Sequence, residues 1–165
     1  MAASNPLLDP AAKLWNALGT PLRRGLAWVV HAKFVHGVSG VIVNEDGNVL
    51  LLKHRFWKHQ RWGFPGGFAL HGETLAATLR RELIEETGLE VHPTMLIRVN
   101  TARGSHAQFV LLAYCNGTPE PRSPEILEAR FWPLTSLPDN LLVEHRALLE
   151  KAPPAHQWPG VPLDR

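Results

Sequence analysis

The stretch that decides the fold is GFALHGETLAATLRRELIEETGL, residues 67–89. Its glycines and charged residues follow one spacing, G-x5-E-x7-R-E-U-x-E-E-x-G-U, in which U is an apolar residue. Every position of this pattern is filled, by Gly67, Glu73, Arg81, Glu82, Leu83, Glu85, Glu86, Gly88 and Leu89. The run is therefore interpreted as one unit, with chemistry carried by its carboxylates.

The spacing of apolar residues predicts a helix over residues 74–87, with Thr74 as its N-cap. Gly88 stands where a helix needs a residue in the left-handed conformation to end. An apolar stripe for packing on a core is formed by Leu75, Ala76, Leu79 and Leu83. The helical period also gathers three carboxylates within roughly 100° of one another, those of Glu82, Glu85 and Glu86.

Three carboxylates this close repel one another, and Arg81 alone cannot neutralise them once they are partly buried. A hard divalent cation can, and oxygen ligands favour Mg²⁺, with Mn²⁺ as its substitute. The alternative is a solvated acidic helix face. The preceding glycine-rich run, residues 63–67, favours the metal site because glycines let the backbone approach an ion or a phosphate closely.

The complete pattern resembles the signature of the Nudix hydrolases, which cleave a diphosphate that links a nucleoside to another group X. The resemblance implies that the ion is held by Glu82, Glu85, Glu86 and the backbone carbonyl of Gly66. It also implies that Arg81 orients a glutamate through a charge-assisted hydrogen bond, and that Glu73 braces the loop without binding metal. The sequence directly before the signature is loosely similar to that of the family branch that acts on ADP-ribose and nucleotide sugars.

Length and composition are those of one globular domain, with 45% hydrophobic and 19% charged residues. A formal net charge of +2 gives no case for general nucleic-acid binding. The only cysteine, Cys115, cannot form an intrachain disulfide, which fits a reducing compartment. Neither a signal peptide nor an uninterrupted apolar span is evident. We therefore expect a cytoplasmic protein whose partner is a small nucleotide.

Three regions are expected along the chain. Residues 1–34 form a helical arm, interrupted near Gly19, which packs on the domain or on a second subunit of a homodimer, with membrane-surface contact as the weaker alternative. Residues 35–153 form the Nudix domain. Residues 154–165 form a proline-rich tail that drapes over the surface or frays.

Strands are expected over residues 38–43, 49–54, 90–100, 107–115 and 129–133, and a second helix over residues 137–151. With the helix of the signature, this order predicts an α/β fold of the Nudix type, an α/β/α sandwich around a mixed β-sheet.

The segment KHRFWKHQRW, residues 53–62, interleaves cations with aromatic rings directly before the metal loop. Cations there could reach phosphate oxygens, and a ring could stack on a base. The candidates for substrate binding are Arg55, Trp57, Arg61 and Trp62, together with Arg103 in the loop of residues 101–106. The alternative is a strand end with aromatic residues packed inward and a solvated loop.

Two glutamates, Glu125 and Glu128, precede the strand expected at residue 129. In many Nudix enzymes an acidic residue of this region extends over the metal site, and this sequence resembles that arrangement. Glu125 is the first candidate for the general base, carried on a loop, residues 117–124, that acts as a hinge. The rival bases are Glu82 and Glu85 on the helix, and both glutamates of the loop could instead be solvated.

The sequence supports a Mg²⁺-dependent pyrophosphohydrolase that acts on ADP-ribose or a nucleotide sugar. One alternative substrate is a nucleoside triphosphate or a dinucleoside polyphosphate. An alternative of another class is a module that binds a nucleotide without cleaving it, although degenerate signatures mark that class and this one is intact. A third alternative is an interaction protein, whose N-terminal arm docks a partner and in which hydrolysis is incidental.

Overall fold

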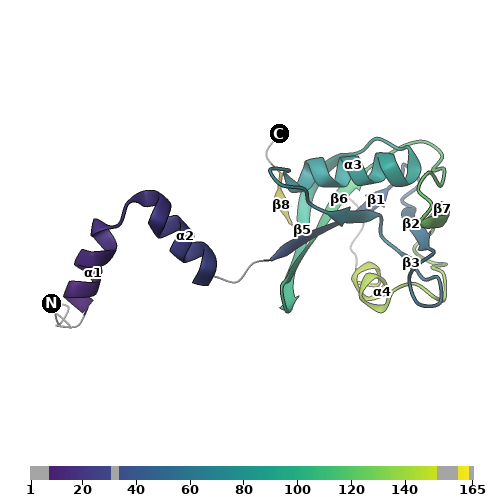
Figure 1. Ribbon diagram of the computed structural model, residues 1–165. Helices are drawn as coiled ribbons and strands as arrows, with labels where there is room; N and C mark the ends of the chain where they lie inside the picture. The colour runs from purple at the N-terminus through teal and green to yellow at the C-terminus, as the bar shows by residue number, and fades with distance from the viewer. Residues whose placement is uncertain (1–7, 31–33, 152–159, 164–165) are drawn as a thin grey trace. The chain divides into compact units, whose positions relative to one another are not determined.

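A computed structural model describes residues 8–30, 34–151 and 160–163 (Figure 1). The chain divides into two compact units, residues 1–33 and 34–165. The first unit contains the helices α1 (Leu8–Ala17) and α2 (Thr20–Val30). The expected break near Gly19 is present, because this residue lies between the two helices.

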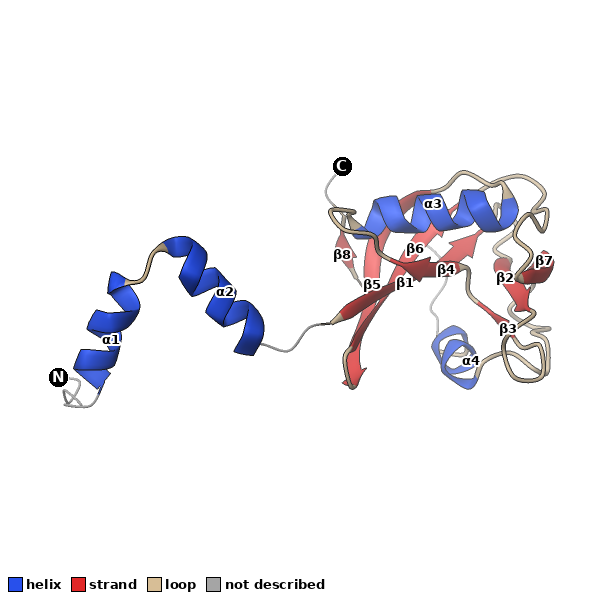
Figure 2. Ribbon diagram, viewed as in Figure 1, coloured by secondary structure: helices blue, strands red, loops and turns tan. Residues whose placement is uncertain are grey.

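The second unit is built on one eight-stranded mixed sheet (Figure 2). Its main path has the order β3-β2-β1-β6-β5-β8, while β4 pairs with β1 and β7 pairs with β2. The central pair, β1 and β6, is parallel, and the other pairs are antiparallel. The strands are β1 (Val35–Val43), β2 (Val49–His54), β3 (Trp62–Gly63), β4 (Gly66–Phe68), β5 (His92–Arg103), β6 (His106–Tyr114), β7 (Ile126–Trp132) and β8 (Val161–Pro162).

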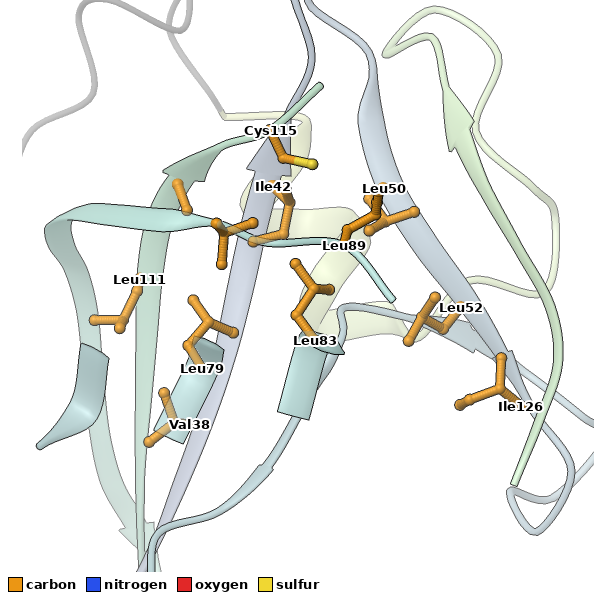
Figure 3. Close-up of a cluster of buried hydrophobic side chains, with 12 residues drawn as sticks. Val38, Ile42, Leu50, Leu52, Leu79, Leu83, Leu89, Leu111, Cys115 and Ile126 are labelled. Carbon is orange, nitrogen blue, oxygen red and sulfur yellow. The ribbon is translucent and has the colours of Figure 1, made fainter. Parts of the chain in front are cut away.

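Two helices cover the two faces of this sheet, α3 (Leu75–Thr87) on one and α4 (Val143–Leu149) on the other (Figure 2). Alternate residues of a strand point to opposite faces. Accordingly Leu50 and Leu52 pack into the core beneath α3, drawn in Figure 3, and Val49 and Leu51 pack into the core beneath α4. The expected α/β/α sandwich around a mixed sheet is confirmed.

Helix α3 begins and ends where its sequence predicts. The Thr74 hydroxyl accepts a hydrogen bond from the Ala77 amide at 3.1 Å, which satisfies one of the amides exposed at a helix start. Gly88 takes the left-handed conformation, with φ 72°, and its amide donates to the Ile84 carbonyl. Of the apolar stripe, Leu79 and Leu83 are completely buried against the sheet, and Leu75 packs there partly buried.

The C-terminal part of the chain differs from expectation in two places. Helix α4 begins at Val143, not at residue 137, because the backbone before it pairs with β3: the Leu142 amide donates to the Trp62 carbonyl at 3.0 Å. The tail was expected to drape or fray, but Val161 and Pro162 add an edge strand to β5. Residues 152–159 lie outside the described part of the chain.

Replacing Leu83 by alanine should lower the free energy of unfolding by about 2–5 kcal/mol, because the side chain is 0% exposed and its removal leaves a cavity under α3. The matched control is Ile84→Ala, one residue on in the same helix and 43% exposed, which should change stability by about 0.5 kcal/mol or less. Urea unfolding measures both variants, and equal losses would contradict the packing described here.

Candidate active site

A cleft of about 960 Å³ crosses one side of the second unit. Its lining combines the glutamates of α3 with residues of the loops and strands around them, namely Gly37, Val38, Ser39, His54, Trp57, Phe64, Gly66, Gly67, Phe68, Leu70, Arg81, Glu82, Glu85, Glu86, Asn100, His106, Gln108, Ser123, Glu125, Leu142, Glu144 and His145. The structure therefore brings the predicted metal ligands together with Arg81, Trp57 and Glu125 in one cavity.

The short strand β4 brings its backbone against the carboxylates of α3. The Gly66 amide donates a hydrogen bond to Glu86 Oε2 at 3.1 Å. Gly66 has φ 145°, and a Cβ atom there would collide with the Val38 carbonyl of β1. A Cβ atom at Gly67 would collide with the Glu82 carboxylate. Glycine is therefore required at position 66, whereas a side chain at position 67 would displace the Glu82 carboxylate.

Arg81 connects the carboxylates of the loop to those of the helix. Its guanidinium donates to Glu73 at 2.8 Å, to Glu82 at 2.8 Å and to the Phe68 carbonyl at 3.0 Å. The hydrogen bond from Arg81, followed by one from the Leu70 amide, lowers the pKa of Glu73 to about 2. These are the contacts that an orienting arginine and a bracing glutamate require.

Glu86 is the most deeply buried carboxylate of the cleft, with 8% of the residue exposed. Burial raises the pKa of Glu86 to about 8, and the charges of Glu82, Glu125 and Glu85 add to the shift. The hydrogen bond from the Gly66 amide acts in the opposite direction but is outweighed. No positively charged group among the described residues therefore contributes to the pKa of Glu86, although Arg81 pairs with the neighbouring Glu82.

The glutamates do not converge into a preformed cage. Glu82 is paired with Arg81, Glu86 is bonded to β4, and the Glu85 side chain is 59% exposed, 3.7 Å from Arg81. Within the described residues, no group of three or more histidine, cysteine, aspartate or glutamate side chains is close enough to hold a metal ion as it stands. The donors nevertheless suit a hard cation, because they are all oxygens and Arg81 brings one positive charge to three carboxylates.

The segment of residues 53–62 contributes less to the cleft than its sequence predicts. Trp57 lines the cleft and stacks on His54, with 3.7 Å between ring centroids. Trp62 was expected to bind substrate, but it is 4% exposed and packs in the core against Trp132. Pairing of β3 with β2 turns this ring inward. The inward alternative is therefore correct for Trp62.

Among the described residues that line the cleft, none is one of the three candidate arginines. Arg55 was expected to bind substrate, but its Nε atom donates to the Pro124 carbonyl at 2.8 Å. Arg61 belongs to the turn before β3, where its carbonyl accepts from the His54 amide at 3.1 Å. Arg103 ends β5, and its side chain lies outside the described part of the chain.

Several residues of the cleft were not predicted from the sequence. Phe64 stacks on His145, with 4.1 Å between centroids, and the Phe64 amide donates to the His145 ring at 3.1 Å. Burial lowers the pKa of His54 to about 4, so its imidazole is neutral, and its Nε2 has no hydrogen-bond partner among the described residues. Of these residues, only His54 could have been noticed from the local sequence, because it is a histidine at the end of a mostly buried strand.

Glu125 and Glu128 have different surroundings. Glu125 lines the cleft, and its charge contributes to the raised pKa of Glu86. Glu128 does not line the cleft and pairs with Lys53 at 2.6 Å. Of the two glutamates, only Glu125 has the position that a loop acid over the metal site requires.

The loop before Glu125 was expected to be a hinge, but it is fastened to α3. The Glu120 amide donates to the Thr87 carbonyl at 3.1 Å, and the Arg122 amide donates to the Glu86 carbonyl at 2.9 Å. The absent Cβ of Gly88 leaves the space that the Arg122 guanidinium occupies. The expected hinge is thus held to the end of α3 by two backbone hydrogen bonds.

Fold and site together define a class: a mixed α/β domain that holds a carboxylate-rich helix over a glycine-rich strand at a cleft. The family described as NUDIX domain matches residues 33–152. The human 8-oxo-dGDP phosphatase NUDT18 is 34% identical over 125 residues, which cover 73% of this chain and 36% of that protein. The match covers 25–38% of the length of four of the curated relatives, the human protein among them.

Solved structures agree with this match. The MutT NUDIX hydrolase from Burkholderia pseudomallei has a TM-score of 0.64 and 26% identity, covering 73% of this chain and 99% of that chain. A putative Nudix hydrolase family member from Chromobacterium violaceum has a TM-score of 0.58 and 27% identity, covering 74% of this chain and 78% of that chain. The chain belongs to the Nudix family. None of its described helices is long and apolar enough to cross a membrane.

In the metal-free protein, Glu86→Gln should remove a pH dependence of stability. Between the ordinary pKa of 4.5 and about 8, folded Glu86 keeps a proton that the unfolded chain has lost. The free energy of unfolding therefore falls as pH rises through this window. At about pH 8.5 the variant should be more stable than the parent by about 1–3 kcal/mol, the cost of one poorly satisfied buried group. At about pH 5 the two should be similar.

Urea unfolding in excess chelator, at the two pH values, measures this difference. The exposed Glu90, beyond the end of the same helix, gives the control Glu90→Gln, which should keep the pH dependence of the parent. A Glu86→Gln protein that still loses stability between the two pH values would show that other groups cause the effect.

Proposed function

We propose that this chain is a Mg²⁺-dependent pyrophosphohydrolase that cleaves the diphosphate of a nucleoside diphosphate linked to a group X, with ADP-ribose or a nucleotide sugar as the first candidate. One observation carries the proposal. A buried carboxylate, that of Glu86, lies beside the backbone of β4 and near Glu82, Glu85 and Glu125 in a single cleft. Such a site attracts a divalent cation, and a bound cation attracts a diphosphate.

The acidic cluster of Glu82, Glu85, Glu86 and Glu125 lies beside β4, which pairs with the central strand β1. The cleft extends to both sides of this cluster. One side, which we call the aromatic side, is lined by rings from the end of β2, from the segments on either side of β3 and from α4. These are His54, Trp57, Phe64 and His145. The other side, which we call the amide side, is lined by polar side chains from β5 and β6. These are Asn100, His106 and Gln108. A substrate with bulky groups on both ends of a diphosphate fits this division.

The proposed roles follow from position. Glu82, Glu85, Glu86 and the Gly66 carbonyl would hold Mg²⁺, or Mn²⁺ as its substitute, while Arg81 orients Glu82. The ion, when bound, neutralises charge on the diphosphate and lowers the pKa of a bound water. Glu125 accepts the proton of the attacking water, because it reaches the cleft from a fixed loop outside the helix. Trp57 offers a ring to the base on the aromatic side.

A second candidate substrate is a free nucleoside diphosphate or triphosphate. It is favoured by the name of the human relative, an 8-oxo-dGDP phosphatase. Such a substrate would occupy the acidic cluster and one side of the cleft only. A nucleotide-binding module without hydrolysis remains the alternative of another class. A cytoplasmic location, a homodimer and the three regions 1–34, 35–153 and 154–165 complete the proposal.

A turnover screen decides between these substrates. With Mg²⁺ present, ADP-ribose or a nucleotide sugar should give two phosphorylated products with a kcat/KM at least about tenfold above those of nucleoside di- and triphosphates, because only the former use both sides of the cleft. Liquid chromatography of the products measures this ratio. Cleavage of nucleoside di- or triphosphates alone would select the second candidate. Nucleotide binding without any cleavage would select the binding module.

Mg²⁺ should raise the melting temperature of the parent, because a ligand that binds the folded state stabilises it. In Glu85→Gln, which changes an exposed side chain of the cluster, this rise should be smaller and kcat should fall by about 10²-fold or more, since the amide has one neutral oxygen in place of a charged carboxylate. Differential scanning fluorimetry and initial rates measure the two effects. Glu90→Gln serves as the control, and an unchanged response to Mg²⁺ in Glu85→Gln would remove this residue from the metal site.

A further inference from the structure

The segment that carries Glu125 is held from two directions. At its start, the amides of Glu120 and Arg122 are bonded to carbonyls at the end of α3. At its end, β7 begins at Ile126 and pairs with β2. The residues between, 123–125, cross from the helix to the sheet, and Ser123 and Glu125 line the cleft. Their position therefore decides where the Glu125 carboxylate lies relative to the glutamates of α3.

Arg55, directly after β2, makes two hydrogen bonds to this crossing. Its side-chain Nε donates to the Pro124 carbonyl at 2.8 Å, and its backbone amide donates to the Glu125 carbonyl at 2.8 Å. Two consecutive carbonyls are thus fixed by one residue. The proline ring already limits φ at Pro124, so the bond to its carbonyl fixes most of the remaining freedom, which is rotation about ψ. This rotation sets the direction in which the Glu125 side chain leaves the backbone.

We propose that Arg55 is a positioning residue, whose side chain holds the Pro124–Glu125 peptide so that the Glu125 carboxylate reaches the reacting water. The inference rests on the proposed function, in which Glu125 is the general base. Arg55 itself does not line the cleft. Its effect on the reaction passes through Glu125 and not through the substrate phosphates.

Two features make the arginine side chain specific for this task. Its guanidinium is planar and always charged, so its bond to a neutral carbonyl is charge-assisted and directional. The backbone bond from Arg55 to Glu125 persists in any variant, so loss of the side chain loosens the crossing without detaching it. A displacement of the order of 1 Å at a catalytic group is enough to lower a rate by about 10²-fold.

The neighbouring ion pair provides a matched control. Lys53 lies two residues before Arg55 and joins the same two strands, through Glu128 at 2.6 Å. It does not line the cleft or contact residues 123–125 in any described hydrogen bond. Lys53→Ala therefore removes a cross-strand side-chain contact of β2 and β7 while it leaves the Glu125 crossing intact.

The experiment is a double-mutant cycle of Arg55→Ala and Glu125→Gln, with the best substrate of the parent and saturating Mg²⁺. Arg55→Ala should lower kcat by about 10- to 100-fold and change KM by less than about threefold. Arg55→Lys, which can still donate to the Pro124 carbonyl, should recover about half of the loss on a logarithmic scale. Lys53→Ala should keep kcat within about twofold of the parent. In the Glu125→Gln background, Arg55→Ala should have almost no further effect.

Three results would overturn the inference. An Arg55→Ala effect of equal size with and without the Glu125 carboxylate would mean that Arg55 acts elsewhere. A rise in KM at constant kcat would make it a substrate contact. A loss below about tenfold in Glu125→Gln alone would leave no base to position, while turnover by the parent would still support the proposed hydrolysis.

A readout that needs no turnover keeps the inference testable even if the parent cleaves none of the substrates. Exchange of the amide hydrogens of Arg122, Ser123, Glu125 and Ile126 should be about tenfold faster in Arg55→Ala than in the parent, because the crossing opens locally more often. The same amides should be unchanged in Lys53→Ala. Unchanged exchange in Arg55→Ala would overturn the positioning role directly.

Discussion

The site depends on one hydrogen bond, from the Gly66 amide to the buried Glu86 carboxylate. A carboxylate in this position is costly to ionise, as its raised pKa shows. Through that bond α3 is attached to β4, which is paired with the central strand β1. The backbone of the same residue accepts the Arg122 amide and so anchors the loop that leads to Glu125. Helix, glycine strand and loop acid are therefore held by a single residue, whose unfavourable charge a divalent cation would offset.

This centre could be predicted from the sequence because its determinants are local. The N-cap at Thr74, the left-handed Gly88 and the helical period of Leu79 and Leu83 define α3 within a residue. The expected strand at residues 49–54 has the bounds of β2, since a turn-forming run precedes it and its apolar residues, 49–52, are continuous. The contact of Arg81 with Glu73 spans only eight residues and follows from the same signature.

Residues whose position could not be predicted from the sequence are placed by contacts between segments that are distant along the chain. Trp62 is turned into the core by pairing of β3 with β2, and α4 starts late because Leu142 pairs with β3. Arg55 resembles a phosphate ligand in its cationic, aromatic segment, which stays a prediction, and its Nε atom donates to a carbonyl 69 residues away. Phe64 and His145 meet across 81 residues of chain. Periodicity and local motifs carry no information about such pairs, because these depend on the order of strands in the finished sheet.

The same separation explains why the signature is specific for the family and silent about the substrate. Residues 67–89 build the acidic centre with its helix, and every residue named for the aromatic and amide sides lies outside them. Those sides come from the β2–β3 turn, from β5 and β6 and from α4, three regions whose sequences are independent of one another. Under the proposed function, changes there would alter the fit of a base or of the group X without disturbing Glu86 and its bond to β4. Relatives with the same centre can thus differ in substrate, and under the proposed function the choice of substrate in this chain would reside in cleft residues such as Trp57 and Gln108.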